Sequence, residues 1–575
     1  MNSKLFCFIS FILTGLAMSA QEKPNVLMIV FDDLNDFIGP LGGHPQAKTP
    51  HLNKLAHDSV IFANAHSNAP VCSPSRASFM RGIHPASSRN YGFKNSAQNP
   101  VLKNSKTLPQ YFQENGYKTY LAGKIFHGKV KGVWDEVGVE TDYGPLAYNG
   151  KKSTLHPSCP KEMSSFGALD ATFARLSDVP SVAASADAPG YTGWMGGNWG
   201  QAIPFKYKSE SDRDLLNDEK SVTWFKNKLG QMEKQKQREP FFMALGIIRP
   251  HTPLVVPDKY FDMFPLDSIQ LSKRKENDLA DTHYHQGSGK DSRGAQIYQA
   301  LKANSEGSDE GLRRYTQAYL ASVAFADEIL GQALDALEKS AYKDNTIVVV
   351  FSDHGYQIGE KDHLWKYTLW EDSTRVPFII KHPDYKHQAG KAVQQPISLI
   401  DVFPTLKDFC QLQGSTKLND HGAELDGFSL KSFLDNPETE QWAGPNFAMT
   451  MTDSYRSKLP KDQHIAIRTK DFRYIHYQDG KEELYDHRRD SNEWTNLASN
   501  PEYAHIKKQL KSDMFESIKD KNTPLSTVSS KKKKIGGEQW KDTYFKKHPS
   551  ADSNKDGELS WPEFNKHKKI RTTNE

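Results

Sequence analysis

The sequence is poor in cysteine, in net charge and in long hydrophobic runs. Its 575 residues include four cysteines, and 74 Lys and Arg nearly balance 70 Asp and Glu, which leaves a formal charge of +4. So small a charge on a chain of this length gives no case for nucleic-acid binding. No apolar run is long enough to cross a bilayer, so a transmembrane segment is not expected. The length allows two or more domains.

The first 20 residues predict a secretory signal peptide. Lys4 precedes an apolar run over residues 5–17, and small residues lead to a cleavage point after Ala20. No cysteine stands at that point, so a lipid anchor is not expected. The sequence also lacks Asn-x-Ser/Thr acceptor sites, which favours a bacterial source. We therefore expect an exported bacterial protein, either periplasmic or secreted.

The remaining cysteines are odd in number. Cys7 leaves with the signal peptide, and Cys72, Cys159 and Cys410 stay in the mature chain. An odd cysteine in an exported protein is either reactive or paired with another molecule. If Cys72 were chemically converted, Cys159 and Cys410 could form one disulfide, and the sequence leaves that pairing open.

Two apolar runs end in acidic residues. Residues 24–31 lead directly to Asp32 and Asp33, and residues 346–351 lead through a serine to Asp353 and His354. Runs without alternation are typical of buried parallel strands, whose carboxyl ends collect ligands. The carboxylates of Asp32, Asp33 and Asp353 suit a hard divalent cation, with calcium or magnesium favoured over zinc. The alternative is that each aspartate caps a helix.

Two further strand-like runs end in cationic or titratable residues. Residues 116–123 lead to Lys124 and, three positions later, His127, while residues 241–248 lead to Arg249 and His251. Each alone could be a solvated loop residue. Together they would supply cations for an anionic ester and a proton donor for its leaving alcohol.

The stretch VCSPSR, residues 71–76, carries the most specific pattern. A lone cysteine is more often a buried core thiol than a catalytic group. Cys72 is followed by Pro74 and Arg76, however, in the order Cys-x-Pro-x-Arg. Together with DD at 32–33, GKIFH at 123–127, RPHTP at 249–253, SDHG at 352–355 and Lys366, this pattern resembles the formylglycine-dependent type I sulfatases, most closely the iduronate-2-sulfatase-like branch.

The resemblance covers about residues 25–497. It implies an α/β fold of the alkaline-phosphatase type, with a mixed, mostly parallel sheet between helices. It also implies that a formylglycine-generating enzyme, or an anaerobic sulfatase-maturating enzyme, converts Cys72 to formylglycine (3-oxoalanine), whose hydrated aldehyde attacks sulfur. The calcium ion of the family would then be held by Asp32, Asp33, Asp353, His354 and the converted residue 72.

The same resemblance implies roles for the other matched residues. Calcium and Arg76 would lower the basicity of the attacking hydroxyl, and Lys124 and Lys366 would bind sulfate oxygens. His251 is the first choice for protonating the leaving oxygen, and His127 for taking a proton from the second hydroxyl. The sequence leaves these acid and base roles open.

The chain outside the matched motifs suggests four parts. Residues 1–20 are the signal peptide and 21–445 the catalytic domain. Residues 446–525 alternate like half-buried strands with a turn at Asp479-Gly480, and a helix follows near 502–518, which predicts a smaller α+β subdomain. Residues 133–211 lack periodicity, and their aromatic segment 191–199 is either a sugar-stacking surface or a packed loop.

The last part, residues 526–575, begins with a lysine-rich linker. An EF-hand-like calcium loop then places acidic and amide side chains at the required spacing around Gly557, and the ligands would be Asp552, Asn554, Asp556, Glu558 and Glu563. The alternative for this segment is a charged tail, since EF-hand loops usually occur in pairs.

These features favour an exported sulfatase that hydrolyses sulfate esters of a carbohydrate, such as ulvan or glycosaminoglycan fragments. One alternative is a phosphonate or phosphodiester hydrolase of the same superfamily, which would share residue 72 and the metal site. Another is a non-catalytic glycan-binding protein, which would keep Cys72 unmodified and would not need the nucleophile machinery.

Overall fold

A computed structural model describes residues 23–93, 96–128, 132–179, 181–186, 190–197, 202–236, 238–284, 293–303, 309–522 and 548–551. The chain separates into two compact units, Met1–Lys521 and Asn522–Glu575. The signal peptide and the calcium loop at 552–563 lie outside the described residues. Within the described part, no helix is both long enough and apolar enough to cross a membrane.

An eight-stranded mixed sheet forms the centre of the first unit. Its order is β18 (Ala392–Val393), β2 (Val60–Phe62), β17 (Phe378–Lys381), β14 (Thr346–Ser352), β1 (Asn25–Phe31), β12 (Phe241–Ile247), β4 (Lys118–Gly123) and β5 (Glu136–Val139). The strands from β14 to β5 run parallel, and β17 is antiparallel to both of its neighbours. The predicted strands at 24–31, 116–123, 241–248 and 346–351 are therefore confirmed, as is the mostly parallel sheet.

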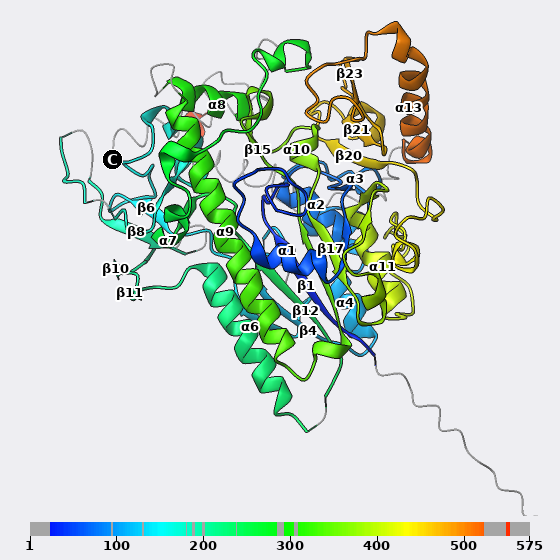
Figure 1. Ribbon diagram of the computed structural model, residues 1–575, viewed down its shortest axis with the longest axis horizontal. Helices are drawn as coiled ribbons and strands as arrows, with labels where there is room; N and C mark the ends of the chain where they lie inside the picture. The colour runs from blue at the N-terminus through cyan, green and yellow to red at the C-terminus, as the bar shows by residue number, and fades with distance from the viewer. Residues whose placement is uncertain are drawn as a thin grey trace, which may run out of the picture. The chain divides into compact units, whose positions relative to one another are not determined.

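Helices cover both faces of this sheet (Figure 1). Leu27, Ile29 and Phe31 of β1 pack in one core with α1 (Pro50–His57), α6 (Asn217–Glu233) and α9 (Glu310–Glu338). Val26, Met28 and Val30 pack in a second core with α2 (Cys72–Phe79), α4 (Leu108–Glu114) and α11 (Val402–Phe409). Because alternate side chains of a strand face opposite ways, burial on both sides requires an uninterrupted apolar run.

A second, antiparallel sheet lies towards the C-terminal end of the first unit. Its order is β20 (Ala448–Thr452), β21 (His464–Arg468), β22 (Phe472–His476) and β23 (Glu482–Asp486), and α13 (Ala504–Ser517) packs on it. The tight connection between β22 and β23 contains Gly480, whose φ of 87° suits glycine. The predicted C-terminal α+β subdomain with an antiparallel sheet is present.

Short elements connect these layers. The helices are α3 (Pro85–Ser88), α5 (Gly167–Ala171), α7 (Asp258–Asp262), α8 (Arg293–Ala303), α10 (Glu371–Thr374) and α12 (Lys431–Asp435). The strands are β3 (Ala65–His66), β6 (Leu146–Tyr148), β7 (Phe173–Arg175), β8 (Gly193–Gly196), β9 (Ile203–Pro204), β10 (Tyr207–Ser209), β11 (Asp212–Arg213), β13 (Leu254–Val256), β15 (Gln357–Ile358), β16 (Leu364–Trp365) and β19 (Ile397–Ser398).

Two questions that the sequence left open are answered here. Tyr191 and Trp194 are buried, and the Trp194 indole on β8 stacks on His156 and donates a hydrogen bond to the Leu176 carbonyl, so this part of the aromatic segment is packed in the core and is not a sugar-stacking surface. Cys159 and Cys410 are free thiols in the two different cores, and a disulfide between them does not form in this structure.

Candidate active site

The acidic residues of two neighbouring strands meet at the carboxyl edge of the central sheet. β1 and β14 pair in parallel with Phe31 opposite Ser352, so Asp32 and Asp33 leave the sheet beside Asp353. The backbone nitrogen of Asp33 donates to Asp353 Oδ1 at 3.3 Å. Asp33 has a φ of 65°, a left-handed conformation that aspartate tolerates better than most residues and that is common at functional sites.

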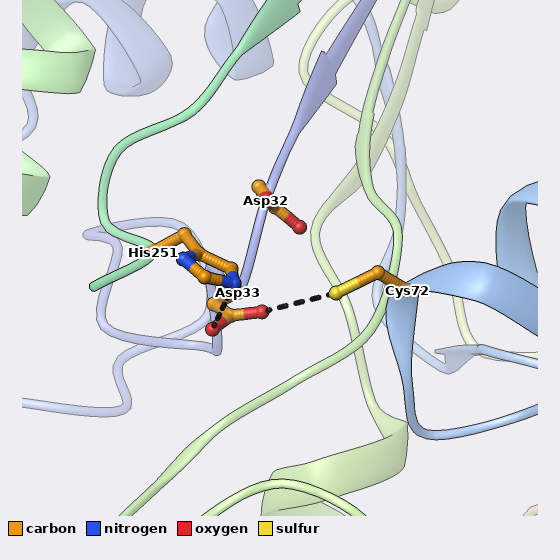
Figure 2. Close-up of side chains that lie close together, drawn as sticks. All are labelled: Asp32, Asp33, Cys72 and His251. Carbon is orange, nitrogen blue, oxygen red and sulfur yellow. Dashed lines mark hydrogen bonds and ion pairs between the residues drawn. The ribbon is translucent and has the colours of Figure 1, made fainter. Parts of the chain in front are cut away.

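Cys72 is the first residue of α2 and faces these carboxylates (Figure 2). Its Sγ lies 3.9 Å from Asp33 Oδ1, 3.2 Å from Lys366 Nζ and 3.2 Å from His354 Nε2. The start of a helix carries a partial positive charge, which favours an anion beside residue 72. Burial, reinforced by the negative charge of Asp32, raises the pKa of the Cys72 thiol, so the thiol stays protonated at neutral pH.

Three buried cations surround the carboxylates. The Arg76 Nε donates to Asp353 Oδ2 at 2.6 Å, and its NH2 lies 3.4 Å from Asp32 Oδ1. Lys124 donates to Asp32, and Lys366 donates to both oxygens of Asp33, at 2.7 and 2.9 Å. Each of the three carboxylates is therefore paired with a buried cation, and residue 72 lies beside both kinds of charge.

Two buried histidines have their orientation set by backbone carbonyls. His251 Nδ1 lies 2.5 Å from the Thr252 oxygen and His354 Nδ1 lies 2.8 Å from the Gly355 oxygen, so each Nδ1 carries the hydrogen. Each Nε2 then carries a lone pair directed into the site. His251 Nε2 lies 3.9 Å from Asp33 Oδ2, and His354 Nε2 lies 3.2 Å from Asp33 Oδ1. Burial and the charge of Lys366 lower the pKa of both rings well below the ordinary value.

His127 stands at the exposed edge of the site. Its ring lies 5.5 Å from that of Phe93. Surrounding protein and the positive charge of Lys124 lower the pKa of His127 to about 4, so the ring is neutral at pH 7. A neutral imidazole near solvent can accept a proton and pass it on.

The carboxylates differ in their protonation. Burial raises the pKa of Asp33 to about 7 and that of Asp353 to about 6. Burial acts in the same direction on Asp32, but the positive charges around it, of which that of Lys124 is the largest, outweigh it and hold the pKa of Asp32 well below its usual value. Crowded, buried carboxylates of this kind are typical of sites that bind a cation.

The residues present fit a divalent cation. Ligand atoms of Asp32, Cys72, Asp353 and His354 lie within 4.8 Å of one another, and so do those of Asp32, Asp33, Cys72 and His251. Asp32 Oδ1 is buried and accepts no hydrogen bond within the described structure. The Gly355 carbonyl orients His354 as backbone carbonyls commonly orient metal-binding histidines. An oxygen-rich set with one imidazole suits calcium or magnesium.

Two residues near the site were not foreseen. Tyr143 packs against both a lysine and a histidine of the site: Lys124 Nζ lies 4.9 Å from the ring centroid, and the His251 ring lies at 4.9 Å. Asp218 on α6 accepts hydrogen bonds from the backbone nitrogens of Ile248 and Arg249, at 2.7 and 3.0 Å, and so holds the turn before His251. No local pattern marks either residue, since Tyr143 lies in the stretch without periodicity and Asp218 resembles an ordinary first-turn acid.

The sequence pattern of the sulfatase family matches residues 24–411, and that of the N-sulphoglucosamine sulphohydrolase C-terminal region matches residues 359–520. The chain belongs to the sulfatase family and is a sulfuric ester hydrolase. It is 33% identical over 489 residues to a sulfatase of Formosa agariphila, and the match covers 83% of this chain and 84% of that protein. It is 30% identical over 418 residues to iduronate 2-sulfatase of Mus musculus, and that match covers 68% of this chain and 69% of the relative.

Comparison with solved structures supports the fold. The phosphonate monoester hydrolase of Agrobacterium radiobacter superposes with a TM-score of 0.61 at 22% identity, over 87% of this chain and 96% of that one. At that identity the likeness speaks for the fold alone. It confirms the expectation of an alkaline-phosphatase-like architecture.

Proposed function

We propose that the protein is an exported sulfatase that hydrolyses sulfate esters of a sulfated carbohydrate with a formylglycine at position 72. The observation that carries the proposal is the placement of Cys72 at the start of α2, within 3.2 Å of Lys366 and His354 and facing Asp33. The similarity to iduronate 2-sulfatase, whose name specifies a uronic-acid sulfate, supports a sugar substrate.

The buried thiol supports conversion rather than thiolate chemistry. A cysteine nucleophile needs a lowered thiol pKa, whereas burial raises that of Cys72. Formylglycine would supply a hydrated aldehyde whose hydroxyl is the nucleophile. The conversion requires a formylglycine-generating or anaerobic sulfatase-maturating enzyme as a partner, and we place it before or during export.

We assign the cation, as calcium, to Asp32, Asp33, Asp353, His354 and residue 72. A divalent ion would neutralise the carboxylates that Lys124 and Lys366 now contact. The two ammonium groups are then available to the oxygens of a sulfate ester. Arg76 stays anchored to Asp353 and keeps positive charge beside residue 72.

The two histidines differ in ways that suit opposite roles. His251 is buried, and its Nε2 faces the site, so it is placed to hold a proton for the leaving oxygen once the anionic substrate raises its pKa. His127 is neutral and exposed, so it is placed to accept a proton and release it to solvent. We therefore assign His251 as the acid and His127 as the base.

The decisive experiment produces the protein with and without a formylglycine-generating enzyme. Peptide mass spectrometry should find formylglycine at position 72 only in the first preparation, and only that preparation should release sulfate from a panel of sulfated sugars prepared from ulvan and from glycosaminoglycans. Activity of a preparation with wholly unmodified Cys72 would contradict the mechanism. Cys72→Ala should fold normally and stay inactive after co-production.

The same panel separates the alternatives. Faster turnover of a phenyl phosphonate than of any sulfate ester would identify a phosphonate hydrolase, to which the fold is also related. Unmodified Cys72 in protein from the native host, with sugar binding but no turnover, would identify a glycan-binding protein. Export is tested by sequencing the mature N-terminus, which should begin at Gln21.

A further inference from the structure

Three aromatic side chains lie next to residues of the site or to one another, and we call Phe93, Tyr367 and Tyr455 the aromatic rim. Tyr367 follows Lys366, whose Nζ lies 3.2 Å from Cys72 Sγ, and its backbone nitrogen donates to the Pro70 carbonyl at 3.0 Å. Phe93 lies beside His127, with 5.5 Å between the ring centroids. Tyr367 is thus the chain neighbour of one site residue, Lys366, and Phe93 contacts another, His127.

The rim is continuous although its members come from distant parts of the chain. The hydroxyl groups of Tyr367 and Tyr455 are hydrogen-bonded at 2.8 Å. A Cβ added to Gly92, next to Phe93, would meet the Tyr367 hydroxyl at 3.1 Å and the Asp453 carboxylate at 3.5 Å. The segment before Phe93 therefore packs directly against Tyr367 and against Asp453, the residue that fixes the turn at Tyr455.

The C-terminal sheet presents Tyr455 to the solvent in a defined conformation. Tyr455 follows the end of β20 and has a φ of 60°, which is uncommon for an aromatic residue. The buried Asp453 side chain accepts a hydrogen bond from the Tyr455 nitrogen at 2.9 Å and fixes this turn. The Tyr455 side chain is nevertheless 69% exposed, and that of Phe93 is 54% exposed. Rings held in place but uncovered are expected where a partner surface binds.

The charges nearby favour an anionic partner. Arg456 and Lys458 follow Tyr455 in the same connection and are both exposed. Aromatic rings with polar tips offer an apolar face for a sugar ring, and exposed cations attract the further sulfate groups of a polymer. A small aryl sulfate would need the buried cations of the site and neither of these features.

We propose that the aromatic rim is a subsite that binds the sugar ring next to the sulfated one, so that the enzyme prefers a sulfated oligosaccharide to the corresponding monosaccharide. This inference rests on the proposed function. The C-terminal subdomain then contributes to substrate selection through Tyr455, in addition to packing against the catalytic domain.

The test compares two substrates in the matured enzyme, a sulfated monosaccharide from the panel and a trisaccharide that ends in the same sulfated ring. The ratio of kcat/KM for the trisaccharide to that for the monosaccharide should fall about three- to tenfold in Tyr455→Ala and in Phe93→Ala, mainly through KM. Tyr455→Phe keeps the ring and should hold the ratio within about threefold of wild type. Thermal unfolding should confirm that every variant is folded.

The matched control is Phe428→Ala. Phe428 is also an exposed aromatic residue, its ring lies 6.0 Å from that of Trp442 in an edge-to-face arrangement, and it lies outside the rim. Its removal should leave the ratio unchanged. Equal ratios in wild type, Tyr455→Ala and Phe93→Ala would overturn the subsite. A dimer of the wild type that Tyr455→Ala dissociates would assign the rim to a second copy and overturn it as well. If the wild type hydrolyses no sulfated sugar, the proposed function itself fails and the subsite with it.

Discussion

A buried arginine joins the C-terminal sheet to the loop that carries Lys366, and its removal should be costly. Arg473 on β22 is fully buried. Its Nε donates to Glu493 Oε1 at 2.6 Å, its NH1 donates to the Leu369 carbonyl at 2.9 Å, and its NH2 donates to Glu371 at the start of α10. Arg473→Met keeps most of the volume but leaves two buried carboxylates with fewer partners.

The magnitude follows from the burial. Breaking a buried ion pair from one side typically costs about 3–5 kcal/mol, because the remaining charge is uncompensated. After the substitution Glu371 keeps Arg468 at 3.0 Å and Glu493 keeps His487 at 3.0 Å, which favours the lower end of that range. Burial would raise the pKa of Glu371, but Arg468, His487 and Arg473 hold it well below the ordinary value.

Arg488→Met is the matched control from the same subdomain. Its guanidinium pairs with Asp486 at 2.7 Å, but the Arg488 side chain is 51% exposed. The buried Asp486 carboxylate keeps hydrogen bonds from the Arg488 backbone nitrogen and the Tyr503 hydroxyl, so the loss in Arg488→Met should be smaller than in Arg473→Met. Urea unfolding followed by tryptophan fluorescence compares the variants, since the buried Trp370 directly precedes Glu371 in the chain. A loss below about 1 kcal/mol in Arg473→Met, no larger than in Arg488→Met, would refute the reasoning.

Three further predictions concern the metal, acid stability and the tail. Asp353→Asn should lower bound calcium and kcat together, by more than the roughly 10–100-fold typical of an outer-shell change. Metal analysis measures the bound calcium, and sulfate release measures kcat. Full activity after exhaustive chelation would contradict the assignment. Burial lowers the pKa of His363 to about 3, so the contribution of its neutral ring to stability is present above pH 6.5 and is lost as pH falls towards 3. Between pH 7.5 and 5.5 the free energy of unfolding, measured in urea, should fall by about 1.4 kcal/mol more in the wild type than in His363→Phe. Equal decreases in the two proteins would rule this out. Deletion of residues 526–575, which we propose form a linker and a separate calcium-binding tail, should leave kcat/KM on a small sulfated sugar nearly unchanged at saturating calcium; a large decrease in the folded truncate would show that the tail belongs to the catalytic unit.

The strands at the centre of the fold could be predicted because their burial on both faces leaves a local trace. Residues 25–31 and 346–352 are apolar without alternation, and such runs occur where helices cover both sides of a sheet. Parallel pairing then brings the residues after each strand to one edge, so the sequence alone predicts that Asp32, Asp33 and Asp353 lie together.

Other features of the site depend on contacts between residues far apart in the chain. Tyr143 touches Lys124 and His251, which is 108 positions away in the sequence, from a stretch with no periodic pattern. The Tyr455 and Tyr367 hydroxyl groups are hydrogen-bonded although the residues are 88 positions apart in the sequence, and Arg473 donates to Glu371 over a separation of 102 positions. Isolated aromatic or charged residues of this kind look the same in sequence whether they are solvated or buried.

The sequence by itself therefore determined the α/β class, the parallel strands and the set of acidic and basic residues that follow them, because backbone periodicity and apolar burial are local properties. Only the tertiary structure decided that Cys159 and Cys410 lie in different cores, that Trp194 is buried, and that the connection after β20 brings Tyr455 against Tyr367, the neighbour of Lys366. Those outcomes depend on how separate layers pack against one another, and packing is settled by complementary shape and charge over the whole chain.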